Sequence, residues 1–174
     1  MIYFIRHGET DYNKEMRFQG HLDIPLNKTG IKQAKQALEN SKSLFFDKIF
    51  YSPLSRAKKT AEIINSFHKK EMIADDRLKE IFMGSLQGII PKTLDEKEQK
   101  LAFTNPEYFG GESHEEFCKR VKSFYDEIKN SKENILIISH GGVYRAIYKI
   151  INNLDDLQFN LKPIPNATIV KIKD

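Results

Sequence analysis

The chain alternates short apolar runs with longer stretches in which apolar residues recur every three or four positions. A continuous apolar run occupies residues 1–5, and a second buried strand is predicted at 134–139, around the apolar run 135–138. Shorter strands are predicted at 48–51, at 72–74 and near 167–172. Runs that are apolar at consecutive positions are typical of strands buried on both faces of a sheet. The pattern therefore predicts a sheet covered by helices on both sides.

Helices are predicted between these strands, and three of them begin at recognisable capping residues. Asn27 is an N-cap for the first helix. Ser52 supplies a hydroxyl cap for the second, with Pro53 at the first helical position. Ser113 and Glu116 fit a capping box for the fourth. The predicted helices cover residues 27–41, 52–69, 94–102, 113–128 and 143–152.

The same spacing predicts which side chains face the core. Leu26 and Ile31 are placed as a hydrophobic staple at the start of the first helix. The predicted buried stripes are Ile31, Ala34 and Leu38 in the first helix, Leu54, Ala57, Ala61, Ile64 and Phe67 in the second, and Phe117, Val121, Phe124 and Ile128 in the fourth. The aromatic core candidates are Tyr3, Phe4, Phe45, Phe46 and Phe50.

Strands that alternate with amphipathic helices predict a three-layer α/β/α sandwich with a largely parallel central sheet. Because the sequence has no repeat, low-complexity stretch or Gly/Ser linker, residues 1–174 are expected to form a single domain. Residues 81–112, which glycines and prolines interrupt, are expected to be a short insertion near the mouth of a pocket. Ligands of such sheets bind at the carboxyl ends of the strands.

Composition and charge add few constraints. Of the 174 residues, 40% are hydrophobic and 30% are charged, which excludes the composition of a disordered protein. The 28 basic and 24 acidic residues give a net charge of +4, but they are interleaved along helix faces, so no nucleic-acid partner is expected. The single cysteine, Cys118, excludes an intrachain disulfide, and the apolar runs are too short to cross a membrane. We expect a cytoplasmic monomer or homodimer with no membrane partner.

Arginine and histidine residues follow two of the predicted strands directly. Arg6, His7 and Gly8 come after the first strand, and His140 and Gly141 come after the strand at 134–139. A neutral imidazole is nucleophilic, and a guanidinium group suits phosphate oxygens. The glycine after His7 would let a ligand approach the backbone closely. Taken alone, however, His7 could simply hydrogen-bond the loop.

A second arginine belongs to the same edge of the sheet. Arg56 lies near the start of the helix that follows strand 48–51, where backbone N–H groups already favour anions. By itself Arg56 could instead pair with a surface acid. Two arginines and two histidines at one edge are hard to explain by packing alone, because clustered charges are rarely buried without a ligand.

In this order, the motifs resemble the histidine phosphatase superfamily, which contains the phosphoglycerate mutases and related acid phosphatases. The resemblance implies a phosphoglycerate mutase-like fold, His7 as the phospho-accepting nucleophile, and Glu80 as proton donor and acceptor. It also implies a phosphate pocket with catalytic Arg6, Arg56 and His140, in which Asn13, Gln19, Gly20 and Gly141 contact substrate. The motifs are RHGET, Asn13, QGHLDIPL, Gly30, SPLSRAKKTA, LKEIFMGSLQG, GGES and ISHGG.

One position departs from the family, and several others carry weaker expectations. Family members commonly carry a Glu-Gly pair where this chain has Gln87-Gly88, so Gln87 receives no catalytic role. Contact of His21 with the pocket is left open. His68 and His114 are expected to face solvent, and Cys118 to be a partly buried thiol without a catalytic role.

The expected activity is hydrolysis of a small phosphate monoester through a phosphohistidine, with no cofactor and no metal. Two alternatives stay open: a phosphoglycerate mutase with the same intermediate, and a phospho-ligand binding module without turnover. A metallohydrolase is a weaker option, because the histidines lack close ligand spacing. The short segment 81–111, with only three lysines as bases, favours hydrolysis over mutase activity. A sugar phosphate, a phosphoglycerate, a nucleotide-like monoester such as α-ribazole phosphate and a phosphoprotein all remain possible substrates.

Overall fold

The described part of the chain folds around one five-stranded sheet with helices on both faces. The computed structural model describes residues 1–154 and 163–173. The strand order is β3-β2-β4-β1-β5, in which all neighbours are parallel except β1 and β5. The strands are β1 (Ile2–Arg6), β2 (Lys48–Tyr51), β3 (Glu71–Ala74), β4 (Ile135–Ser139) and β5 (Ile169–Lys173). The predicted strands and the largely parallel sheet are confirmed.

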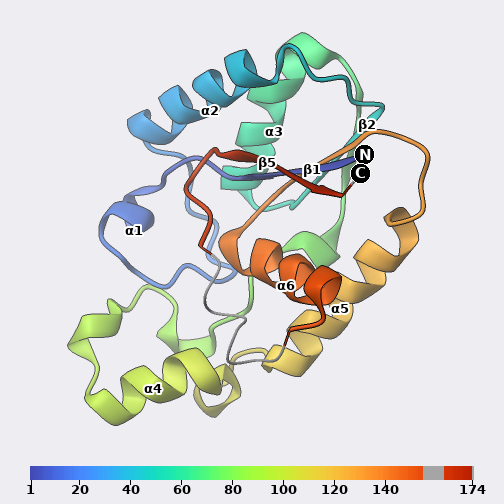
Figure 1. The fold of residues 1–174 in the computed structure, drawn as a ribbon. Helices are drawn as coiled ribbons and strands as arrows, with labels where there is room; N and C mark the ends of the chain where they lie inside the picture. Colours follow the sequence, from blue (N-terminus) through green and yellow to red (C-terminus); the bar gives the residue numbers. More distant parts are fainter. Residues whose placement is uncertain (155–162, 174) are drawn as a thin grey trace.

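The helices form the two outer layers of a sandwich (Figure 1). One layer holds α2 and α3, and the other holds α5 and α6. Between α3 and α5 the chain forms β3, α4 and four short 3-10 turns, and Figure 1 shows α4 to one side of the sheet. The helices are α1 (Asp11–Lys14), α2 (Lys28–Ser41), α3 (Ser55–His68), α4 (Glu96–Thr104), α5 (His114–Ile128) and α6 (Gly141–Asn152).

Successive residues of the central strands face opposite layers. In β1, Ile2 and Phe4 pack with side chains of α5 and α6, whereas Tyr3 and Ile5 pack with side chains of α2 and α3. All four are buried. Because both faces are covered, β1 and β4 are apolar at every position before their last residues, which is the pattern that the sequence showed.

The buried face of α2 differs from the prediction. Ile31 and Leu38 are only half-buried. Small residues allow α2 to lie close to α3 and to the loop after β1: a Cβ atom added at Gly30 would lie 2.1 Å from the carbonyl oxygen of Glu9. The residues that α2 buries are Gly30, Ala34, Ala37 and Ser41.

Gly8 is needed for the same close approach. A Cβ atom added at Gly8 would lie 2.4 Å from the carbonyl oxygen of Gly30. The expectation that Gly8 leaves room for a ligand is therefore wrong: its missing side chain leaves room for the backbone of α2. The two glycines together fix the path of the loop that leaves β1.

The start of α3 is also corrected. The helix begins at Ser55 with Leu54 as its N-cap, and no side chain caps it. Ser52 lies before the helix, where its hydroxyl is 2.8 Å from Nε2 of His140. The hydroxyl that was expected to cap the helix therefore contacts a histidine far away in the sequence.

Three aromatic residues on this side of the fold do not lie where the pattern placed them. Phe67 and Phe45 are 51% and 59% exposed, and neither belongs to the core. His68, four residues after Ile64, takes the inward position in the last turn of α3 because a spacing of four falls closer to the same face than a spacing of three. Its ring is 4.8 Å from that of Phe46, so it does not face solvent freely.

The close approach at Gly30 gives a test with a definite sign. In an ordinary helical position, Gly→Ala stabilises a protein by up to about 1 kcal/mol. Gly30→Ala is expected to destabilise this protein by about 1–3 kcal/mol, because the methyl group would overlap backbone that has no room to move. Urea unfolding would measure this, with the exposed Lys35→Ala in the same helix as a control. Unchanged or increased stability of Gly30→Ala would contradict the packing described here.

Candidate active site

The pairing of β1 with β4 brings the two histidines together. In the parallel register Arg6 lies beside Ser139, and the backbone N–H of His7 donates to the carbonyl oxygen of Ser139 at 2.9 Å. His7 and His140 follow directly, with ring centroids 5.1 Å apart. Two residues separated by most of the chain therefore meet at the carboxyl end of the sheet.

A cavity of about 190 Å³ opens at this edge. It is lined by Arg6, His7, Asn13, Gln19, Gly20, Arg56 and Glu80, all of which the sequence had singled out. His140 is fully buried and does not line the cavity, and Gly141 is likewise not part of its wall, although Gly142 is.

The hydrogen bonds of His7 determine which ring nitrogen is free to react. Nδ1 is 2.7 Å from the carbonyl oxygen of Gly8, and because a carbonyl can only accept, Nδ1 carries the proton. Burial, followed by the positive charges of Arg56 and Arg6, holds the pKa of His7 well below its usual value. The ring is therefore neutral at pH 7, with the lone pair on Nε2.

Two guanidinium groups, that of buried Arg56 and that of partly buried Arg6, supply positive charge beside His7. Arg56 donates to the carbonyl oxygens of Leu22 and Gly20 at 2.7 and 2.8 Å, and Arg6 donates to that of Ile164 at 2.9 Å. Burial lowers the pKa of Arg56, Glu80 opposes this effect, and the resulting pKa is about 10. The group therefore stays charged at pH 7.

Several buried polar atoms at this edge lack partners within the described residues. They are Nε of Arg6, Nε of Arg56 and Nδ1 of His140. A buried donor left unsatisfied costs about 1–3 kcal/mol, and an oxygen-rich ligand in the cavity would offset this cost for the two arginines, which line it. Burial, and then Arg56, holds the pKa of His140 well below its usual value, so this ring is also neutral without a ligand.

The two amide side chains of the wall are held by their oxygens. Thr10 donates its hydroxyl to Oε1 of Gln19 at 2.9 Å. Asn13 accepts at Oδ1 from the backbone N–H of Thr10 at 3.2 Å and from Asn166 at 3.4 Å. Holding the amides by their oxygens orients them, and Asn13 and Gln19 retain N–H groups suited to anionic oxygens.

Glu80 is the carboxyl group of the cavity wall. Its oxygens accept from the backbone N–H of Gly142 and of Ile81, each at 3.1 Å. A Cβ atom added at Gly142 would lie 2.0 Å from Oε1 of Glu80, so a side chain at this position would push the carboxylate away from where it lies. Gly142 is in the first turn of α6, where backbone N–H groups favour a negative charge.

The structure adds residues that sequence reasoning missed or placed elsewhere. Arg145 lines the cavity from α6, one turn after Gly141, and Arg17 lines it from the loop after α1. The helical spacing from Gly141 was a signal that could have found Arg145. His114 is half-buried and lines the cavity, so the expectation that it faces solvent is wrong.

His21 and Gln87 support the site from outside the cavity. Nε2 of His21 donates to the backbone carbonyl of Glu80 at 2.7 Å. Oε1 of Gln87 accepts from the backbone N–H of His21 at 2.6 Å. Neither residue lines the cavity, and the amide that departs from the family pattern holds two loops together.

The described residues contain neither a ready metal site nor a helix that could cross a membrane. No group of three or more histidine, cysteine, aspartate or glutamate side chains among residues 1–154 and 163–173 is placed to hold a metal ion. None of the helices in this same part of the chain is long and apolar enough to span a membrane.

A family comparison agrees with this arrangement over nearly the whole chain. The sequence model of the histidine phosphatase superfamily (branch 1) matches residues 2–173. The chain belongs to this superfamily. The resemblance based on ordered motifs is confirmed, and the molecule is an enzyme of the histidine phosphatase type.

Individual relatives of this histidine phosphatase cover most of its length. PhoE of Bacillus subtilis (strain 168), named an uncharacterized phosphatase, is 35% identical over 156 residues, which are 88% of this chain and 78% of PhoE. Phosphoglycerate mutase-like protein 4 of Arabidopsis thaliana is 35% identical over 159 residues, 85% of this chain and 69% of the relative. The structure of mycobacterial glucosyl-3-phosphoglycerate phosphatase is similar with a TM-score of 0.85, at 27% identity, covering 97% of this chain and 87% of that one.

The two buried neutral imidazoles predict a loss of stability in acid. Their pKa values lie below the unfolded value of about 6.5, so the unfolded chain binds protons that the native chain does not. Stability is therefore fully present above about pH 6.5 and falls as the pH drops toward the native values, by on the order of 1 kcal/mol per imidazole between about pH 7.5 and pH 5.5. Urea unfolding in phosphate-free buffer would measure this slope.

Removing one of the two imidazoles tests the assignment. His7→Gln is expected to flatten the dependence of unfolding free energy on pH, whatever its effect on total stability. An unchanged slope would show that His7 takes up its proton in the folded protein as readily as in the unfolded one.

Proposed function

We propose that this histidine phosphatase hydrolyses a small phosphorylated metabolite through a covalent phosphohistidine on His7. The observation that carries the proposal is the state of the His7 ring. Its Nδ1–H is engaged by Gly8, its pKa is lowered by burial and by two arginines, and it lines a cavity together with those arginines and one carboxyl group. A neutral imidazole beside a cationic phosphate site suits nucleophilic attack on phosphorus.

In the first step Nε2 of His7 attacks phosphorus, forming a P–N bond while the P–O bond to the leaving group breaks. Protonated Glu80 donates its proton to the departing oxygen, so that an alcohol leaves rather than an alkoxide. Arg6, Arg56 and the amides of Asn13 and Gln19 hold the phosphoryl oxygens, whose negative charge spreads in the transition state. The carbonyl of Gly8 stabilises the positive charge that develops on the ring.

In the second step the same carboxyl group, now ionised, takes a proton from water. The resulting hydroxide attacks phosphorus, the P–N bond breaks with its electron pair returning to Nε2, and inorganic phosphate leaves. Glu80 is thereby protonated again, and His7 is neutral. His140, buried behind His7 with Nδ1 lacking a partner among the described residues, is placed to gain a proton when phosphate binds.

The cavity favours a small substrate and hydrolysis. Its volume of about 190 Å³ holds a phosphoryl group and a small leaving group, and its outer wall includes Phe18, Met83 and Phe103. None of the three lysines in 81–111 lines it, so this segment provides no additional cation for a phosphoglycerate carboxylate. With access for water, the phosphoenzyme would be hydrolysed rather than return its phosphoryl group to a second hydroxyl.

Trapping the intermediate tests the nucleophile. Brief incubation with a ³²P-labelled phosphate monoester is expected to label the protein with phosphate that is stable to base and lost in acid, as a phosphoramidate is. His7→Ala is expected to abolish both the labelling and the release of phosphate, whereas His68→Ala, which replaces a histidine outside the cavity, should retain both. Undiminished turnover in His7→Ala would rule out the proposed mechanism.

Product analysis separates the remaining alternatives. Screening phosphorylated metabolites with His7→Ala as the blank is expected to find release of inorganic phosphate, unaffected by a chelator. With 3-phosphoglycerate, conversion to 2-phosphoglycerate would instead support the mutase. Phosphate binding without turnover of any monoester would support a binding module, and loss of activity with a chelator would support a metallohydrolase.

A further inference from the structure

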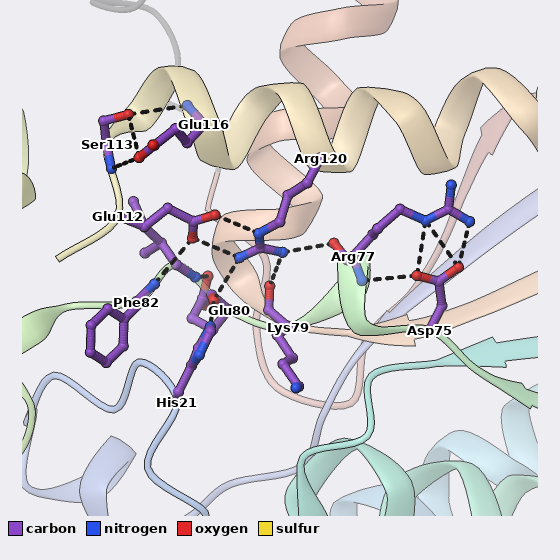
Figure 2. Close-up of polar contacts among 11 residues, drawn as sticks. His21, Asp75, Arg77, Lys79, Glu80, Phe82, Glu112, Ser113, Glu116 and Arg120 are labelled. Atoms are coloured by element: carbon purple, nitrogen blue, oxygen red, sulfur yellow. Dashed lines mark hydrogen bonds and ion pairs between the residues drawn. The ribbon is translucent and has the colours of Figure 1, made fainter.

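One arginine outside the cavity uses all five of its N–H donors within the protein (Figure 2). Arg120 of α5 donates through Nη1 to the carbonyl oxygens of Arg77 and Lys79, at 2.7 and 2.8 Å. Nη2 donates to the carbonyl oxygen of Glu80 at 2.9 Å and to Glu112, and Nε donates to the other oxygen of Glu112 at 2.6 Å. The guanidinium group therefore joins three carbonyl oxygens of one short backbone segment to a carboxylate.

The backbone that Arg120 holds is the segment that carries the proposed proton donor. Lys79 and Glu80 lie between two short 3-10 turns and belong to no helix or strand. Their carbonyl oxygens therefore have no place in a regular backbone ladder, and Arg120 supplies their partners. A residue in such a segment keeps its position only if side chains elsewhere satisfy its backbone.

Glu80 is also held from the side opposite Arg120. There, its carbonyl oxygen accepts a second hydrogen bond, from His21. On the side of Arg120, the backbone N–H of Phe82 donates to Glu112 at 3.3 Å. Arg120 and Glu112 are themselves mostly buried, with side chains 20% and 16% exposed, and the guanidinium carbon lies 4.7 Å from the ring centroid of Phe117. The frame around Glu80 is thus packed against α5 rather than exposed on a loop.

We propose that Arg120 is the positioning residue for the Glu80 carboxyl group. The inference rests on the proposed role of Glu80 as proton donor and acceptor, and Arg120 itself touches no substrate. Its planar fork fixes the carbonyls of residues 77, 79 and 80, so that the carboxyl group stays between the N–H groups of Gly142 and Ile81 and faces the cavity. Displacement of a catalytic group by about 1 Å is enough to lower a rate substantially.

Arg120→Lys tests this role because a lysine keeps the charge but lacks the planar fork. An alkyl phosphate needs a proton on its departing oxygen, whereas dinitrophenyl phosphate does not. For the alkyl phosphate, kcat/KM is expected to fall about 10–100-fold, since a positioned general acid contributes about 10²–10⁴-fold. For dinitrophenyl phosphate kcat/KM should change less than about 3-fold by the same reasoning, while kcat falls and a burst of dinitrophenol appears as the phosphoenzyme accumulates.

Two comparison variants distinguish the possible failures. Arg77→Lys replaces an arginine whose side chain contacts Asp75 and Glu127 instead of the Glu80 segment, and it should leave both kcat/KM values unchanged. Like Arg120→Lys, Glu80→Gln should lower kcat/KM for the alkyl phosphate more than for dinitrophenyl phosphate. The difference between the two substrates should be larger for Glu80→Gln. If Glu80→Gln shows no such dependence, the proposed role of Glu80 fails. If Glu80→Gln does show this dependence, and Arg120→Lys lowers kcat/KM equally for both substrates or for neither, only the role of Arg120 is overturned.

A second variant keeps the inference testable if Arg120→Lys does not fold. Glu112→Gln preserves the shape of the partner carboxyl group but removes its charge and one acceptor. It is expected to lower kcat/KM for the alkyl phosphate by about 3–10-fold, as for a partly displaced acid, with little change for dinitrophenyl phosphate. Equal loss for the two substrates would show that the network only stabilises the fold.

Discussion

The structure depends on placing two guanidinium groups and two imidazoles together at one largely buried edge of a sheet. Arg56 is wholly inaccessible, and His7 and His140 are nearly or fully so. Such a cluster is costly without a counter-ion, and the protein meets part of that cost with backbone carbonyls for the arginines and with neutral rings for the histidines. A phosphoryl group carries the negative charge and the oxygen atoms that the cluster lacks.

The surrounding layers hold these side chains in place through contacts that leave no space for adjustment. Gly8 and Gly30 allow the loop after β1 to cross the start of α2, and Gly142 allows the Glu80 carboxylate to approach α6. The first contact links the end of β1 to the first turn of α2, and the second links the irregular segment after β3 to the first turn of α6. The position of His7 is thus set by backbone packing of the sandwich itself, which is more rigid than a mobile surface loop.

Glu80 is held differently from the other groups of the cavity wall. Arg6 and His7 are fixed by their place at the end of β1, and Arg56 by the start of α3, whereas Glu80 lies in an irregular segment. Side chains from α5 and from the loop after α1 satisfy the carbonyls of this segment, as Figure 2 shows for Arg120 and His21. In the proposed mechanism this carboxyl group gives and takes a proton in successive steps, so it must keep one position throughout, and the frame of hydrogen bonds holds its segment in place.

The sequence by itself determined the strands, most helix boundaries, the capping residues Asn27 and Ser113, and the convergence of His7 with His140, because these follow from local periodicity and from the rule that adjoining parallel strands end at one edge. The tertiary structure decided the rest. Whether Ser52 caps a helix or contacts His140, and whether His114 faces solvent or the cavity, depends on residues far away along the chain. Such choices follow from distances between elements, and no local pattern of apolar and polar positions encodes those distances.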